Sequence, residues 1–226
     1  LIDLDERFGL LKGSKRVVDL GIAPGGWSQV VRKKSPAAKV VGIDLLPTDP
    51  IEGVTIFQMD FMADEAPQAL QDALDGPPDL VISDMAANTV GHKQTDHLRT
   101  MGLVEAAAHF AVDVLEEGGT FVAKVLAGGT DTELLALLKK HFRTVKHAKP
   151  PASRKGSSEW YVIAQGFKGR EKAPLSPDLT WRQQPGQQRR PGPGWLQRWP
   201  QPEHRQPAQR RLPERRQRRL LRPERH

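Results

Sequence analysis

The sequence predicts an α/β fold in which a parallel β-sheet is covered by helices on both faces. Three observations predict it. Short apolar runs alternate with segments of helical period, a glycine-rich turn follows the first apolar run, and the alternation stops near residue 170, where the composition changes. We therefore expect residues 1–170 to form one domain around a single core and residues 171–226 to form a separate tail.

The first half of the chain is expected to supply four strands and three helices. A helix is expected over residues 1–12, where apolar side chains recur at helical spacing, with Gly13 as its end. Two prolines at 77–78 cannot continue helical hydrogen bonding, so a helix must end before them. The strands are expected at 16–20, 39–45, 53–58 and 79–83, and the other two helices at 28–34 and 66–74.

The second half is expected to add two helices and three strands. The first helix follows an apolar period and ends at a glycine pair, and the second begins with the spacing of a capping box. These elements are a helix over 98–115 ended by Gly118 and Gly119, a strand over 120–126, a helix that starts at 130–133 and carries Leu134, Leu138 and Phe142, and strands over 144–149 and 159–167.

The glycine-rich turn, DLGIAPGGWSQ from Asp19, joins the first strand to the following helix. Glycines let a ligand approach the backbone, so the turn indicates a cofactor site, although a turn without a ligand is the alternative. Its spacing, G-x-x-x-G-G, is neither the dinucleotide fingerprint nor a P-loop. Asp44 ends the second strand, where an acid can accept hydrogen bonds from ribose hydroxyls; a solvated loop carboxylate is the simpler reading.

Lys124 is unusual because it interrupts an apolar strand. A buried ammonium is costly without a partner, so Lys124 needs a neighbouring carboxylate or a place at the strand end. Asp84 follows the fourth strand, and Glu159 begins a strand that can lie beside that of Lys124. We expect the three side chains to converge at the sheet edge, either as a catalytic group or as a buried ion pair alone.

Composition separates the tail from the rest of the chain. Residues 171–226 hold 14 basic and 5 acidic residues and ten of the 19 prolines, which leaves 20 basic and 22 acidic residues in 1–170. We expect the tail to be disordered. Trp181, Trp195 and Trp199 lie among its arginines and could stack on unpaired bases; a solvated tail, or a product of an altered reading frame, are the alternatives.

Several classes of protein are excluded or disfavoured. The chain has no cysteine, which excludes disulfides and thiolate chemistry and is compatible with a reducing cytoplasm. It has no apolar run long enough to span a membrane, and its seven histidines lack metal-ligand spacing. We therefore expect a cytoplasmic protein that uses neither membrane nor metal. Leu1 is not an initiator methionine, so a truncated N-terminus is expected.

The motifs together resemble those of the FtsJ/RrmJ family of ribose 2'-O-methyltransferases. The resemblance covers residues 1–170 and rests on several separate strings. These are DLGIAPGGWSQ, DLLPTDP from Asp44, the MDF around Asp60, SDMAAN around Asp84, FVAKV around Lys124, and KPPASRKGSSEWY, which contains Glu159. The resemblance implies a Rossmann-like class I methyltransferase fold, with a seven-stranded, mostly parallel sheet whose last strand is antiparallel.

The resemblance also implies the cofactor and the site. The cofactor is S-adenosylmethionine, and the catalytic group is a Lys-Asp-Lys-Glu tetrad whose last three members match Asp84, Lys124 and Glu159. The first lysine belongs ahead of Leu1. The residues expected to contact the cofactor are Gly25, Trp27, Asp44, Asp60 and Asp84. Where the family usually has proline, this chain has Ala87, which puts the geometry of the following loop in question.

The implied substrate is RNA, and the compact body resembles the bacterial branch that methylates a uridine of 23S ribosomal RNA, within the large subunit and as a monomer. Lys149, Arg154 and Lys155 form a basic loop for phosphate contacts, with residues 32–34 as weaker candidates. Three alternatives stay open: a transfer-RNA 2'-O-methyltransferase, a noncatalytic RNA-binding or ribosome-assembly factor, and a nicotinamide-dependent oxidoreductase. The last leaves Lys124 and Glu159 unexplained.

Overall fold

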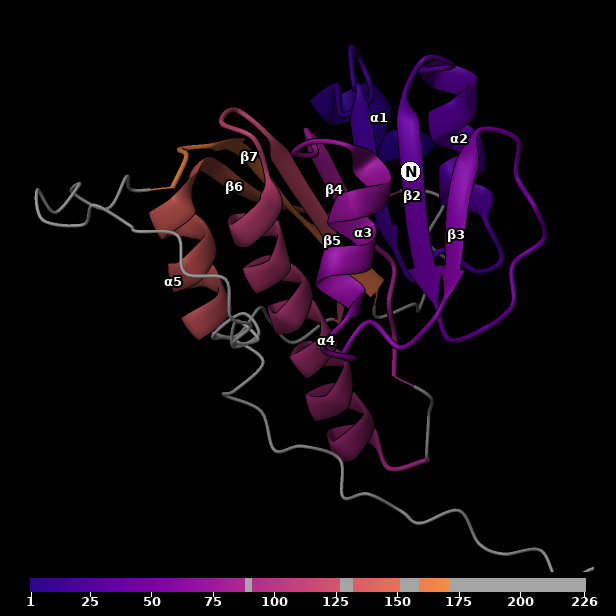
Figure 1. Ribbon diagram of the computed structural model, residues 1–226. Helices are drawn as coiled ribbons and strands as arrows, with labels where there is room; N and C mark the ends of the chain where they lie inside the picture. Colours follow the sequence, from indigo (N-terminus) through magenta and orange to yellow (C-terminus); the bar gives the residue numbers. More distant parts are fainter. Residues whose placement is uncertain (88–90, 127–131, 151–158, 171–226) are drawn as a thin grey trace, which may run out of the picture.

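A seven-stranded sheet with helices on both faces forms the body of the chain in the computed structural model, which describes residues 1–87, 91–126, 132–150 and 159–170 (Figure 1). The strands are β1 (Arg16–Leu20), β2 (Lys39–Asp44), β3 (Val54–Gln58), β4 (Leu80–Ser83), β5 (Thr120–Leu126), β6 (Phe142–Ala148) and β7 (Glu159–Phe167). The helices are α1 (Ile2–Phe8), α2 (Gly26–Lys34), α3 (Ala66–Leu74), α4 (Lys93–Val114) and α5 (Thr132–His141).

The strand order is β3-β2-β1-β4-β5-β7-β6. Strands β1 to β5 pair in parallel, and β7 is antiparallel to both of its neighbours. The predicted fold, with its antiparallel last strand, is therefore confirmed. The order reverses between β1 and β4, and open α/β sheets bind ligands outside the carboxyl ends of the strands at such a point.

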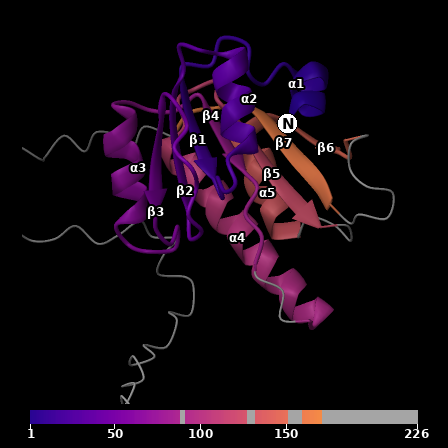
Figure 2. The same cartoon turned by 90° about the vertical axis from the view of Figure 1, so that its right-hand side faces the viewer.

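The two faces of the sheet carry separate cores. Helices α1 and α2 lie on one face, and α3, α4 and α5 lie on the other (Figures 1 and 2). Successive residues of β1 show the division, because Val17 packs in the α1/α2 core and Val18 in the α3/α4/α5 core, both with no exposed surface. Burial on both sides explains why the central strands β1, β2, β4 and β5 read as apolar runs, whereas the edge strands β3 and β6 are partly exposed.

The expected helix over 1–12 is wrong in its length, because α1 ends at Phe8. Gly9 adopts a left-handed conformation (φ 63°) and its N–H donates to the Asp5 carbonyl, which closes the helix. The Asp5 side chain then accepts a hydrogen bond from the Leu11 N–H at 2.8 Å. Leu10 and Leu11 are still buried, but they belong to the segment after the helix.

Two other boundaries differ from those expected. Helix α4 begins at Lys93, earlier than its apolar period indicates, because its first turns extend beyond the sheet and need no buried stripe (Figure 1). Phe142 begins β6 and is not part of α5. The ammonium of Lys168, which follows β7, donates to the carbonyls of Lys139 and Lys140 at 3.1 and 3.0 Å. Carbonyls at the end of α5 thus have a hydrogen-bond donor from outside the helix.

Candidate functional site

The glycine-rich turn leads from β1 into α2 and requires glycine at two positions. Gly21 has φ +80°, and a Cβ there would lie 2.9 Å from the backbone nitrogen of Met85. Gly25 has φ +110°, and a Cβ there would lie 2.6 Å from Cδ1 of Ile51. Left-handed backbone and close packing together explain these glycines. The Gly21 N–H donates to the Ile43 carbonyl at 2.9 Å, which fixes the turn beside β2.

Two acids after β2 and β3 are held by backbone N–H groups. The Asp44 carboxylate accepts bonds from the N–H groups of Ala23 and Leu46, both at 2.9 Å, so it links the glycine-rich turn to the loop after β2. Asp60 accepts the N–H of Met62 at 2.9 Å. These bonds orient both carboxylates without using all of their acceptor positions.

A cavity of about 690 Å³ lies at this carboxyl edge of the sheet. Asp44, Asp60 and Asp84 line it together with Gly21 and Ala23 of the turn. The rest of its lining includes the apolar residues Ile43, Met59, Phe61, Met85, Leu98 and Leu103, and Arg99 of α4. An apolar cavity with a few converging polar groups has the size and character of a cofactor site.

Gly25 and Trp27, which the sequence also places at the cofactor, are not among the residues that line this cavity. Trp27 instead packs against Tyr161, with the ring centroids 5.6 Å apart and the planes 40° from parallel. Gly25 shapes the turn and is the N-cap of α2. A direct contact of these two residues with the cofactor stays a prediction.

Lys124, Asp84 and Glu159 come together as the sequence predicts. The ammonium of Lys124 lies 3.1 Å from Oδ1 of Asp84 and 3.8 Å from Oε1 of Glu159. Parallel pairing of β4 with β5 brings Asp84 to this edge, and antiparallel pairing of β5 with β7 sets Glu159 opposite Leu126. Lys124 is only 9% exposed, so its cation is held in place by the two acids and by the packing around its chain.

Burial dominates the electrostatics of Asp84. Desolvation raises the pKa of its carboxyl above the ordinary value, against the opposing attraction of Lys124, and the charge of Glu159 raises it further. The neighbouring Tyr161 lies opposite Lys124 in the β5–β7 register. Burial, with the charges of Asp84 and Glu159, raises the pKa of its hydroxyl, so Tyr161 keeps its proton near neutral pH.

Asp19 and Tyr161 lie near the charged groups of the site, and the sequence reasoning assigned neither of them a role. Asp19 has no exposed surface, accepts a bond from the Ser28 hydroxyl at 2.6 Å, and leaves its Oδ1 without a hydrogen-bond partner. Burial raises its pKa to about 7. An acid inside an apolar strand is the same signal that drew attention to Lys124, so Asp19 could have been found by that rule.

The candidate RNA contacts are only partly within the described residues. Lys149 is exposed just after β6, whereas Arg154 and Lys155 lie outside the described residues. Of the weaker candidates on α2, Arg32 donates through its guanidinium to the carbonyls of Glu52, Pro36 and Ala38, and Lys34 lies 3.9 Å from the Asp5 carboxylate. Arg32 therefore holds the fold together at the end of its helix.

Ala87, which replaces the family's usual proline, forms a hydrogen bond that proline cannot form. Its N–H donates to the hydroxyl of Thr100 on α4 at 3.3 Å. This bond ties the segment after Asp84 to the helix that lines the cavity. Asn88 lies outside the described residues.

Within the described ranges, no group of three or more His, Asp or Glu side chains is placed to hold a metal ion. No helix in the same ranges has the length and apolar character needed to cross a membrane.

Known proteins share this fold and sequence. A family model described as FtsJ-like methyltransferase matches residues 1–167. The protein named Ribosomal RNA large subunit methyltransferase E of Novosphingobium aromaticivorans is 86% identical over 170 residues, which cover 75% of this chain and 77% of that protein. The protein of the same name from Erythrobacter litoralis is 82% identical over 170 residues, with the same coverage.

Solved structures agree. A Plasmodium falciparum protein described as a ribosomal RNA methyltransferase superposes with a TM-score of 0.66 and 31% identity, covering 75% of this chain and 95% of the other. The Methanococcus jannaschii fibrillarin pre-rRNA processing protein has a TM-score of 0.53 and 15% identity, over 71% and 70% of the two chains, and shows a common fold. By sequence and by structure, the chain belongs to the FtsJ-like methyltransferase family.

Proposed function

We propose that this protein transfers a methyl group from S-adenosylmethionine to a ribose 2'-hydroxyl of RNA, and that the target is a uridine of 23S ribosomal RNA within the large subunit. We assign the activity to residues 1–170 and treat residues 171–226 as a separate tail. One observation carries the proposal: Asp84 both lines the cavity and pairs with Lys124, so a donor in the cavity and an acceptor at Lys124 meet at a single carboxylate.

The cavity suits a nucleoside that carries an amino-acid group. Asp44 at the end of β2 is placed for ribose hydroxyls, Asp60 for an exocyclic amino group, and Asp84 for the methionine end. Apolar side chains around Met59, Phe61 and Leu103 offer contacts to a base. When bound, S-adenosylmethionine supplies a methyl group that is electrophilic because it is attached to a sulfonium.

Lys124 is proposed to contact and activate the 2'-hydroxyl. A ribose hydroxyl is a weak nucleophile, and the ammonium of Lys124 can assist it by stabilising the oxyanion that develops during attack. In this proposal the hydroxyl proton passes to the neighbouring Asp84 carboxylate, whose pKa is raised, and the methyl group moves to the ribose oxygen as S-adenosylhomocysteine leaves. Asp84 and Glu159 hold the ammonium from two sides, at 3.1 and 3.8 Å, and so fix its direction. Holding the hydroxyl in line with the methyl group supplies a further part of the acceleration.

The names of the relatives favour ribosomal RNA over transfer RNA, because the proteins that are 86% and 82% identical are both called large-subunit ribosomal RNA methyltransferases. The choice of the ribose hydroxyl depends on the Lys124, Asp84 and Glu159 group, which is suited to a hydroxyl acceptor. The choice of uridine depends on the family resemblance.

The experiment supplies labelled S-adenosylmethionine and two substrates: large ribosomal subunits from a strain that lacks this enzyme, and transfer RNA from the same strain. The methylated nucleotide is then mapped by its resistance to alkaline cleavage, which a 2'-O-methyl group confers. We expect label in one uridine of 23S ribosomal RNA. Label in transfer RNA, label on a base, or RNA binding without any label would each contradict the proposal.

A further inference from the structure

We propose that the RNA substrate lies across the α1/α2 face of the protein, and that Arg7 and Lys146, which both lie over the Phe8 ring, bind its phosphates there. This inference depends on the proposed function, since it names where the substrate of that site is held. Nothing in the sequence singled out Arg7 or Lys146. Arg7, Phe8 and Lys146 are called the α1–β6 cluster below.

The catalytic group opens toward the α1/α2 face of the sheet. Lys124 is two residues from Val122 on β5, and Val122 packs in the α1/α2 core, so the two side chains share a face. Tyr161, opposite Lys124, packs against the same core. The cavity, in contrast, is lined by residues of α4 and of the opposite core. A methyl donor bound in the cavity therefore does not cover the α1/α2 face, and the acceptor RNA can approach Lys124 from that face.

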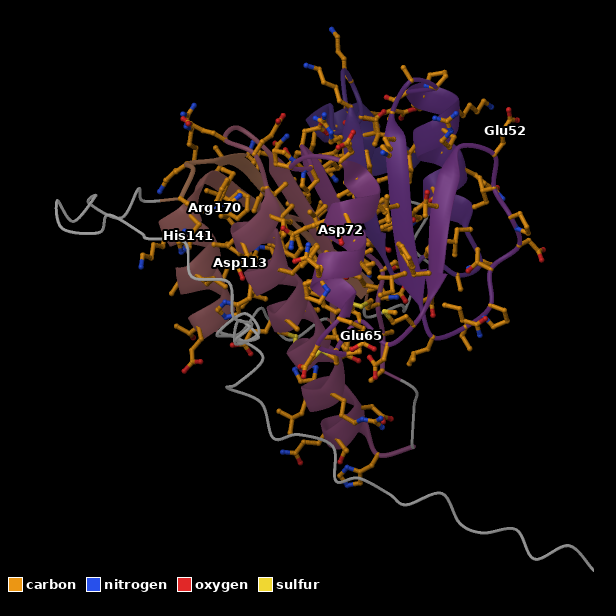
Figure 3. The ribbon with its side chains drawn as sticks, viewed as in Figure 1. Glu52, Glu65, Asp72, Asp113, His141 and Arg170 are labelled. Atoms are coloured by element: carbon orange, nitrogen blue, oxygen red, sulfur yellow. The ribbon has the colours of Figure 1, made fainter. Side chains whose placement is uncertain are left out.

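The α3/α4/α5 face carries acids as well as the lysines at the end of α5. Glu65 and Asp72 at α3 and Asp113 on α4 all lie on that face of the molecule, and Figure 3 shows them on the side turned to the viewer. Each of these carboxylates would repel phosphates that came near it. The choice of the α1/α2 face therefore depends on the side of the sheet on which Lys124 and Tyr161 lie.

The α1–β6 cluster offers two fixed cations on the favourable face. The guanidinium carbon of Arg7 lies 5.2 Å from the centre of the Phe8 ring, and the ammonium nitrogen of Lys146 lies 5.9 Å from it. Helix α1 is held against the sheet because the Gln165 side chain donates to the Phe8 carbonyl at 3.1 Å. The ring therefore sets both cations at the junction of α1 and β6.

Among the described residues, no carboxylate forms an ion pair with either of these two cations. Helix α1 also carries Asp3, Asp5 and Glu6, which lower its net charge; of these, Asp5 is engaged by the Leu11 N–H and by Lys34 of α2. Two exposed cations that lie over an aromatic ring, with no ion pair to a described residue, are suited to phosphate oxygens.

The cluster is close enough to the catalytic group to serve the same RNA. In the β6–β7 register, Ala148 lies opposite Tyr161 and Lys146 lies opposite Ile163, so Lys146 is two residue steps, about 7 Å along the sheet, from the level of Tyr161. Strand β6 is also two strand spacings, about 10 Å, from β5, which carries Lys124. Lys149 is exposed and directly follows Ala148, the residue opposite Tyr161, so it lies one residue beyond the level of Tyr161, just past the end of β6. The spacing suits phosphates of nucleotides next to the target.

The test compares two double variants of the complete protein. Arg7→Gln with Lys146→Gln removes two charges from the α1–β6 cluster. Lys139→Gln with Lys140→Gln removes the same charge from the exposed end of α5 on the other face and is the matched control. Binding of a labelled 23S ribosomal RNA fragment is measured between about 0.05 and 0.2 M salt, and KM is measured for large ribosomal subunits.

We expect the Arg7/Lys146 variant to bind the fragment roughly tenfold more weakly, with a salt slope smaller by about 1.4–1.8, since each lost phosphate contact removes about 0.7–0.9 from it. Its KM should rise by a similar factor, and the control should stay within about twofold of wild type. Equal losses in the two variants, or no loss, would overturn the inference. A wild-type protein that methylates nothing would instead refute the proposed function. The binding comparison would still show whether RNA binds to the α1/α2 face.

Discussion

Asp19 makes the stability of the protein depend on pH. Its side chain is fully buried, accepts one hydrogen bond from Ser28, and has a pKa raised from 3.8 to about 7, mainly by burial. The folded chain therefore keeps a proton that the unfolded chain releases above about pH 4. The contribution of protonated Asp19 to the free energy of unfolding is fully present below the pKa of the unfolded chain, and it is lost as the pH rises to the pKa of the folded chain.

The size of the effect follows from the two pKa values. A shift from 3.8 to about 7 corresponds to about 4 kcal/mol in total, of which about 3 kcal/mol falls between pH 5 and pH 8. Asp19→Asn keeps an acceptor for the Ser28 hydroxyl and cannot ionise, so it imitates the protonated acid. Between pH 5 and pH 8, we expect the free energy of unfolding to fall by about 3 kcal/mol less in the variant than in wild type.

Urea unfolding at pH 5, 6, 7 and 8 measures the prediction as the free energy of unfolding of each protein. Asp84, whose pKa is also raised, contributes to both proteins; its charge is a smaller cause of the Asp19 shift than burial, so most of its contribution cancels in the comparison. Asp64→Asn, at an exposed position, is the control and should follow wild type. Parallel pH profiles for wild type and Asp19→Asn would refute the reasoning, because they would mean that Asp19 is ionised in the fold at pH 5 or is not buried.

Two further predictions concern the cofactor cavity. Gly21→Ala should abolish measurable S-adenosylhomocysteine binding in calorimetry, since its Cβ would meet the Met85 backbone at 2.9 Å with φ at +80°; binding within about threefold of wild type would contradict this. Asp44→Ala should weaken binding at least tenfold, because it removes the proposed ribose acceptor and frees the N–H groups of Ala23 and Leu46. Here an unchanged affinity would show that the donor does not use Asp44.

Much of the fold could be predicted because the central strands are buried on both faces. The bounds of β1, β5, β7 and α3 follow directly from apolar runs and from the prolines after α3. The bounds of α1 and α4 could not be predicted, since Gly9 ends α1 by its backbone conformation and the first turns of α4 extend beyond the sheet. The carbonyls that end α5 are satisfied by Lys168, which is distant in sequence.

Some features of the site could also be predicted from the sequence, and others could not. Strand ends predict where Asp44, Asp84 and Lys124 lie, because parallel strands bring their carboxyl ends to one edge. The Trp27–Tyr161 contact joins α2 to β7, and only the strand order brings these elements together. The proposed α1–β6 cluster is beyond sequence reasoning for the same reason, since it depends on α1 lying over β6 and β7.

The central claim is that Lys124 activates the acceptor hydroxyl beside a donor held in the cavity. Lys124→Ala, made in the protein expressed from its complete gene, tests it in a single-turnover methyl-transfer assay on large ribosomal subunits. S-adenosylhomocysteine affinity serves as the control for folding, since Lys124 is not among the cavity-lining residues. We predict a rate at least about 100-fold below wild type with cofactor affinity unchanged. A rate within about threefold of wild type would contradict the account.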